Sequence, residues 1–136
     1  MGSLTKKVYI CHPYSGDPEG NVEKVEKIVK EISSENMRKV EQSAVVNYSS
    51  GSVEFGTYGE YNEVSDIIVT PIAAFLAFPK FMSEDGGVPR EVAMSYCISL
   101  LSGCDEIWIY DRNITDGMRD EIDFSVENGI KLVWKY

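Results

Sequence analysis

The sequence predicts an α/β fold in which helices cover both faces of a mainly parallel sheet, a three-layer sandwich. Short apolar, β-branched stretches alternate along the chain with stretches of helical periodicity. One stretch, DEIWIY, is apolar almost throughout, as a strand covered on both faces requires. The 136 residues suffice for one domain over 1–136 and are too few for two ordinary domains.

The first elements are a strand at residues 6–11, a turn-rich loop and a helix. Asp17 followed by Pro18 fits an N-cap and a first helical position. The helix is predicted to run to about residue 34. Its apolar positions recur at helical spacing, with Glu and Lys on the other face; they are Val22, Val25, Ile28, Val29 and Ile32.

The second half repeats the alternation and completes a Rossmann-like or flavodoxin-like order of elements. The predicted elements are a strand near 66–75, a helix opened by Pro89, a strand over 105–110, a helix over about 116–127 ended by Gly129, and a strand over 130–136.

Residues 36–65 do not fit this alternation. They contain two β-prone pieces, AVVNY and SVEFGTY, on either side of a Ser-Ser-Gly turn signal at 49–51. This pattern predicts an inserted β-hairpin beside the first helix. Residues 1–3, MGS, resemble an expression remnant and are left out of the fold prediction.

The formal net charge of −9 argues against binding along a nucleic-acid backbone, whose affinity depends on cationic contacts to phosphate. No apolar run approaches the roughly 20 residues of a membrane span, and no signal-peptide pattern is present, so no membrane contact is expected. The negative net charge does not exclude a small anionic ligand, because backbone N–H groups can bind such a ligand locally.

The cysteines Cys11, Cys97 and Cys104 are odd in number and lack CxxC spacing, and His12 is the only histidine. Neither a zinc site nor a disulfide framework is predicted, and we expect no metal, no cofactor and a reducing, cytoplasmic setting. His12 is either an acid/base or, as is more common beside a strand end, a structural residue.

Ligands of open α/β sheets bind outside the carboxyl ends of the strands. Two loops occupy that place, HPYSGDPEGN at 12–21 and DRNITDG at 111–117. The second leads into a helix N-terminus with Thr115 or Asp116 as its cap. Both loops also read as ordinary turns. The candidate binding residues are Pro13, Tyr14, Ser15, Gly16, Thr115, Asp116, Gly117 and Met118.

Two further features leave alternatives open. Phe75, Phe78 and Phe81 are either core residues or a stacking surface for a base, with Phe78 as the binding candidate. Glu121 falls one turn into the last helix, between Met118 and Ile122, where it either edges the apolar stripe or lies in a pocket.

Three motifs carry a resemblance: KKVYICHPYSGDPEGN, AAFLAFPKFM and LLSGCDEIWIYDRNITDGMRDEI. Together they resemble the nucleoside 2-deoxyribosyltransferase-like superfamily, above all its small bacterial and phage members. The resemblance covers residues 6–35 and about 66–134. It implies cleavage or exchange of the N-glycosidic bond of deoxynucleosides or their monophosphates.

The resemblance also implies residue roles. Within GMxxE, the nucleophile matches Glu121, and the tyrosine that helps place this carboxylate and the sugar matches Tyr9. Thr115 matches a hydroxyl that helps to hold phosphate. Another active-site Asp of these enzymes is expected eight residues before Asp105, where this chain has Cys97.

Three functions therefore remain open: an N-glycosidic hydrolase or (deoxy)ribosyltransferase, a non-catalytic binder of a nucleotide or nucleotide-derived signal, and a protein-interaction module. The resemblance also implies a homo-oligomer. Apolar residues surround the helix after Pro89, so a second subunit, or the 36–65 segment, is expected to cover it; they are Tyr96, Ile98, Leu100 and Leu101.

Overall fold

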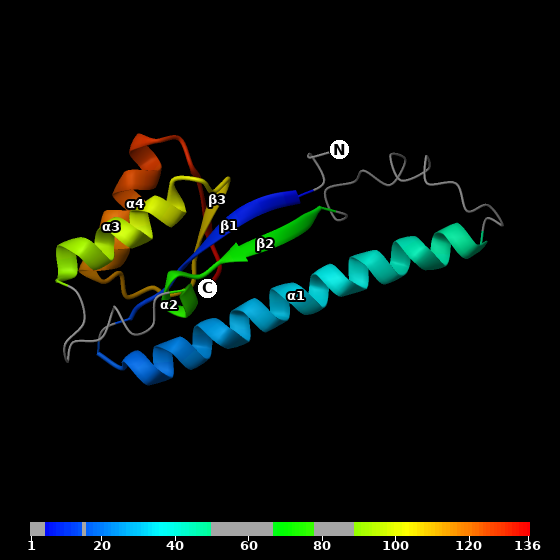
Figure 1. Ribbon diagram of the computed structural model, residues 1–136, viewed down its shortest axis with the longest axis horizontal. Helices are drawn as coiled ribbons and strands as arrows, with labels where there is room; N and C mark the ends of the chain where they lie inside the picture. Colours follow the sequence, from blue (N-terminus) through cyan, green and yellow to red (C-terminus); the bar gives the residue numbers. More distant parts are fainter. Residues whose placement is uncertain (1–4, 15, 50–66, 78–88) are drawn as a thin grey trace.

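Four parallel strands form the centre of the computed structural model, in the order β2-β1-β3-β4 (Figure 1). The structure describes residues 5–14, 16–49, 67–77 and 89–136, and over 41–49 it describes the backbone only. The strands are β1 (Thr5–Cys11), β2 (Ile68–Ile72), β3 (Glu106–Ile109) and β4 (Lys131–Trp134). The helices are α1 (Pro18–Ser49), α2 (Ala74–Ala77), α3 (Arg90–Leu101) and α4 (Asp116–Glu127).

The helices lie on both faces of the sheet, so the predicted three-layer α/β class is confirmed. Helices α1 and α2 lie on one face, and α3 and α4 lie on the other (Figure 1). Side chains alternate between the faces along β1. Val8 and Ile10 pack in the core beneath α1, whereas Tyr9 and Cys11 pack in the core beneath α3 and α4.

Helix α1 begins where the sequence predicts and ends later. Asp17 caps it, accepting a hydrogen bond from the Gly20 backbone N–H at 3.3 Å. The helix continues to Ser49 instead of ending near residue 34, and Figure 1 shows it extending beyond the strands. The predicted hairpin is therefore wrong in its first half, because AVVNY at 44–48 is helical. Its second half lies outside the described residues.

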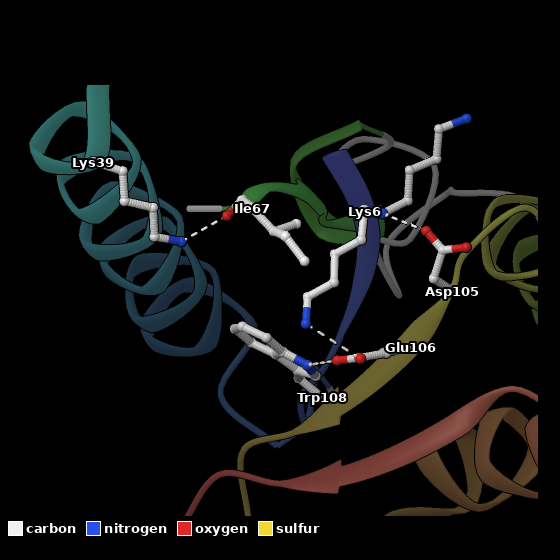
Figure 2. Close-up of polar contacts among 7 residues, drawn as sticks. Lys6, Lys39, Ile67, Asp105, Glu106 and Trp108 are labelled. Atoms are coloured by element: carbon white, nitrogen blue, oxygen red, sulfur yellow. Dashed lines mark hydrogen bonds and ion pairs between the residues drawn. The ribbon is translucent and has the colours of Figure 1, made fainter. Parts of the chain in front are cut away.

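Two side chains of α1 explain why the helix continues. The Asn36 amide bonds to both backbone groups of Val69 on edge strand β2, at 2.8 and 3.0 Å. Lys39 Nζ donates to the Ile67 carbonyl at 2.7 Å (Figure 2). These bonds satisfy the outer edge of β2 and hold the second half of α1 against it. β-propensity depends strongly on context, and AVVNY continues a helix whose preceding turns these bonds hold against β2.

Polar contacts fix the start of β3 against β1 (Figure 2). Asp105 Oδ2 accepts from the Lys7 backbone N–H at 2.8 Å, and the Asp105 N–H donates to the Lys7 carbonyl at 2.8 Å. Lys6 Nζ donates to Glu106 at 3.2 Å, and Trp108 Nε1 donates to the same carboxylate at 2.8 Å. Lys6 and Lys7 lie near the amino end of β1, so these contacts hold the beginnings of the two strands together in the register in which they pair.

The remaining elements follow the prediction closely, with one correction. The strand expected near 66–75 is shorter, because residues 74–77 form helix α2. Helix α4 has the predicted bounds, and Gly129 adopts a left-handed φ of +70° just beyond it. In α3, Leu101 is fully buried, while Tyr96, Ile98 and Leu100 are half-buried. The expected homo-oligomer stays a prediction.

Across the described ranges, none of the helices has the length and apolar character needed to cross a membrane.

Candidate active site

Glu121 and Tyr9 lie 112 positions apart in the chain and are in direct contact in the structure. The Tyr9 hydroxyl donates a hydrogen bond to Glu121 Oε2. The Cys11 thiol donates to the other carboxylate oxygen, Oε1, at 3.5 Å. Glu121 is 5% exposed and Tyr9 is 1% exposed. The carboxylate therefore lies in the interior with a separate donor on each oxygen.

Local periodicity brings these groups together. Tyr9 and Cys11 are two residues apart on β1, so both side chains point toward the α3 and α4 layer. On α4, Met118, Glu121 and Ser125 recur at helical spacing and form the buried stripe of the helix. Glu121 thus belongs to the buried stripe of α4 and contacts β1, one of the two central strands of the sheet, rather than lying at the edge of the apolar stripe.

The interior position changes the acidity of Glu121. The pKa of this carboxyl is raised to about 7, mainly by burial and to a small extent by the nearby Asp120 charge. The hydrogen bonds from Tyr9 and Cys11 act in the opposite direction, since they stabilise the ionised form. Glu121 therefore exists in both protonation states near neutral pH.

The donors themselves stay neutral. Burial raises the pKa of Tyr9 well above its usual value, and the Glu121 charge adds to the effect. Burial likewise raises the pKa of the Cys11 thiol, again with a contribution from Glu121. The carboxylate is consequently held by a phenol and a thiol, and its negative charge is not neutralised by either.

Cys97 occupies the position where the superfamily resemblance expects an aspartate. It is 1% exposed, lies on α3 and interacts with the Tyr9 hydroxyl. Burial raises the pKa of its thiol to about 11. A neutral thiol therefore lies beside Tyr9, at the position where the resemblance implies a second carboxylate.

The loop after β1 contributes mainly packing in its described part. Pro13 is buried, and Tyr14 is half-buried with its ring 4.9 Å from that of Phe75. Gly16 has a φ of +96°, which a residue with a side chain rarely adopts. Ser15 and Phe78 lie outside the described residues, as does Phe81. His12 is buried, with Nδ1 2.8 Å from the Pro13 carbonyl, which fits the structural alternative for this histidine.

The second loop forms the start of α4. Thr115 is its N-cap, and Oγ1 accepts from the Met118 N–H at 3.2 Å. Asp116 is exposed and Gly117 half-buried, so both are accessible from the loop side. Met118 is buried in the core beneath the helix. Of the four predicted binding residues here, Thr115, Asp116 and Gly117 lie at the surface of the helix start and Met118 does not.

Among the cavities lined by described residues are two that Glu121 does not line. One, of about 400 Å³, lies between α1 and the sheet, beside Trp108, Tyr110 and Lys135. The other, of about 420 Å³, lies along α3 and α4 beside Met94 and Asp123. Within the described ranges, no group of three or more His, Cys, Asp or Glu side chains is arranged to hold a metal ion.

The sequence reasoning did not single out Cys11. A usable signal existed, because residue 11 follows Tyr9 by two positions on a strand and so shares its face. The contact between Cys97 and Tyr9 has no such local signal, since it joins α3 to β1.

A family model described as a domain of unknown function (DUF7768) matches residues 61–135, more than half of the chain. The matched segment contains every described element from β2 to β4, and Glu121 with them, but it does not reach Tyr9. Searches among curated proteins and among solved structures give no match.

Proposed function

The chain belongs to the DUF7768 family of domains of unknown function, and we propose that it breaks or exchanges the N-glycosidic bond of a nucleoside or nucleotide with Glu121 as nucleophile. One observation carries this proposal. The tyrosine and the glutamate that the superfamily resemblance pairs are far apart in sequence, and they are hydrogen-bonded in the interior.

The proposed chemistry suits a buried carboxylate. Cleavage of the bond between the anomeric carbon and the base nitrogen builds positive charge on the sugar. The ionised Glu121 attacks that carbon, the bonding electrons leave with the base, and the base takes a proton from water. A glycosyl ester of Glu121 remains. Attack by water on the ester gives hydrolysis, and attack by a second base gives transfer.

Tyr9 positions the carboxylate in this proposal by holding Oε2. The low exposure of the site strengthens the interaction between the carboxylate and the developing sugar charge, because water screens it little. Glu121 carries no cationic hydrogen-bond partner among the described residues, so its charge is free to stabilise a cationic transition state.

Cys97 supports a second candidate function. Where the resemblance expects an aspartate, this chain has a buried neutral thiol against Tyr9. A site with one carboxylate can bind a nucleotide or a nucleotide-derived signal without turning it over. The non-catalytic binder is therefore the alternative to the enzyme.

A single experiment separates these candidates. The protein is incubated with nucleosides, their 5′-monophosphates and NAD-type dinucleotides, free base is measured by chromatography, and bound ligand by native mass spectrometry. Release of base from one substrate class supports the enzyme. A bound but intact ligand supports the binder, and neither outcome in any mixture removes both.

The setting and assembly belong to the same proposal. Cys11, Cys97 and Cys104 are all free thiols, which suits a reducing cytoplasmic compartment. We propose a homo-oligomer in which a neighbouring subunit covers the apolar sides of α3.

We expect kcat/KM to rise with pH through about 7 and to level off above pH 8. Burial raises the pKa of Glu121 to about 7, and only its ionised form is nucleophilic. Below that pKa the rate should change about tenfold per pH unit. Initial rates of base release between pH 5 and 9 measure this profile. A rate that stays flat or falls as pH rises through 7 contradicts the role of an ionised Glu121.

A 5′-monophosphate is expected to bind more tightly than its nucleoside, because the start of α4 offers the Thr115 hydroxyl and free backbone N–H groups. Thr115→Val should remove most of this preference, whereas Thr115→Ser keeps the hydroxyl and should retain it. Calorimetric titration of both ligands measures the preference. Nucleoside affinity is the internal control, because loss of the cap costs the helix about 1 kcal/mol. Equal affinities for the two ligands in the wild type remove the phosphate assignment.

A further inference from the structure

Both oxygens of Glu121 are held by donors from a single strand. Tyr9 donates to Oε2 and Cys11 donates to Oε1, and the two donors lie two residues apart on β1. Cys11 is completely buried. Its thiol is therefore shielded from bulk solvent and directed at the carboxylate.

We propose that Cys11 is a positioning residue for Glu121, whose thiol fixes Oε1 and so, together with Tyr9, sets the plane of the carboxylate. With Tyr9 alone, the carboxylate can turn about its last side-chain bond. With a donor on each oxygen, the plane is fixed relative to β1. The role of Cys11 in the reaction rests on the proposed function. Its effect on the pKa of Glu121 does not.

The groups that face Glu121 come from three elements. Tyr9 and Cys11 face it from β1, the Cys97 thiol adjoins from α3, and Asp120 acts on it along α4. From β3, the buried side chains of this core are apolar; they are Ile107 and Ile109. Burial, the Asp120 charge, the Tyr9 phenol and the Cys11 thiol therefore set the pKa of Glu121. Of the two donors, Cys11 can be replaced while Tyr9 is left unchanged.

A thiol is a weak hydrogen-bond donor, whereas a hydroxyl is a stronger one. The hydrogen bond from the Cys11 thiol lowers the pKa of Glu121, whereas burial raises it. Cys11→Ala removes the donor and should raise the pKa of Glu121. Cys11→Ser replaces it with a hydroxyl and should lower that pKa. Replacements of one side chain thus move the same property in opposite directions, which simple loss of packing does not do.

Cys104 provides the matched control. Its thiol is also buried, but it donates to the Leu100 carbonyl at 3.4 Å and its charged neighbours are Asp105 and Lys7. Cys104→Ala and Cys104→Ser make the same chemical changes in the same core without touching Glu121.

The test measures the free energy of unfolding by urea for all five proteins between pH 4.5 and 9, together with the pH profile of base release. The Glu121-dependent fall in stability runs from the unfolded pKa to the folded pKa. Its midpoint should therefore rise by about half a pH unit in Cys11→Ala, if loss of the donor raises the folded pKa by about one unit. It should fall in Cys11→Ser and stay in place in both Cys104 variants. The serine variant keeps a hydrogen-bond donor on the same Cβ, so the test does not depend on the alanine variant folding.

The outcomes separate this inference from the proposed function. Midpoints that move as expected, with no base released by any protein, support the Cys11 assignment and remove the enzyme. Base release whose pH profile is the same in wild type and both Cys11 variants, with unmoved stability midpoints, overturns the Cys11 assignment and leaves the enzyme standing. Equal shifts in the Cys104 variants also overturn it.

Discussion

Glu121→Gln is expected to lower the rate of base release by roughly a thousandfold or more, because it removes the attacking carboxylate. The fold should remain intact, since glutamine has nearly the same shape and its amide oxygen can still accept from Tyr9. Initial rates with the best substrate of the nucleoside and nucleotide panel measure the loss, and circular dichroism checks the fold.

Glu127→Gln is the matched control for this loss. It makes the same substitution on the same helix at an exposed position, so its rate should stay within a few-fold of wild type. Near-wild-type turnover by Glu121→Gln would remove Glu121 from the mechanism and leave its contact with Tyr9 as a purely structural one.

The stability of the wild type is expected to fall by about 3 kcal/mol between pH 4.5 and 8 through Glu121 alone. Burial raises the pKa of Glu121 in the folded protein to about 7, against 4.5 for an unburied glutamate. Between these values the folded state binds more protons than the unfolded state. The contribution is therefore full below pH 4.5 and is lost as pH rises through 7.

Glu121→Gln cannot ionise, so this part of the pH dependence should be absent from the variant. The difference in unfolding free energy between the two proteins should grow in favour of the variant from pH 5 to pH 8. Urea unfolding at half-unit intervals of pH gives the comparison. Parallel curves for the two proteins would show that Glu121 is not titrating in the interior.

These two expectations describe one trade-off. An ionised carboxylate in a site of low exposure destabilises the fold, and the same carboxylate is the group that the proposed reaction requires. Tyr9 and Cys11 limit the cost, because each donates to one of its oxygens.

Local patterns predicted most of the fold. Helix α4 could be bounded from the cap at Thr115 and the glycine at 129, because both ends depend on neighbouring residues. The alternation of strand-like and helical stretches along the chain and the apolar run in β3 were sufficient to predict a parallel sheet with helices on both faces.

The end of α1 could not be predicted in this way. The β-prone residues at 44–48 by themselves predict a strand. The helix that contains them is instead held by hydrogen bonds from Asn36 to Val69 and from Lys39 to Ile67, about 30 residues further along the chain. The end of β2 could not be predicted for a similar reason. Ala74 and Phe75 belong to helix α2, and each packs into one of the two cores.

The candidate site divides in the same manner. The helical stripe of α4 raised the question of Glu121, and the resemblance paired it with Tyr9; the contact between them is observed. The place of Cys11 beside Tyr9 could have been predicted, because side chains two residues apart on a strand lie on the same face. The place of Cys97 against Tyr9 required the packing of α3 on the sheet, which no single segment encodes.

The most direct test of a Glu121 nucleophile is the mass of the peptide that contains this residue during turnover. The protein is mixed with a 2′-deoxynucleoside or its 5′-monophosphate, quenched in acid at successive times and digested, with Glu121→Gln treated in parallel. The proposed mechanism predicts that the wild-type peptide gains the mass of the sugar or sugar phosphate on Glu121, while the variant peptide gains nothing. Base release at every time point from a protein whose Glu121 peptide stays unmodified would contradict it.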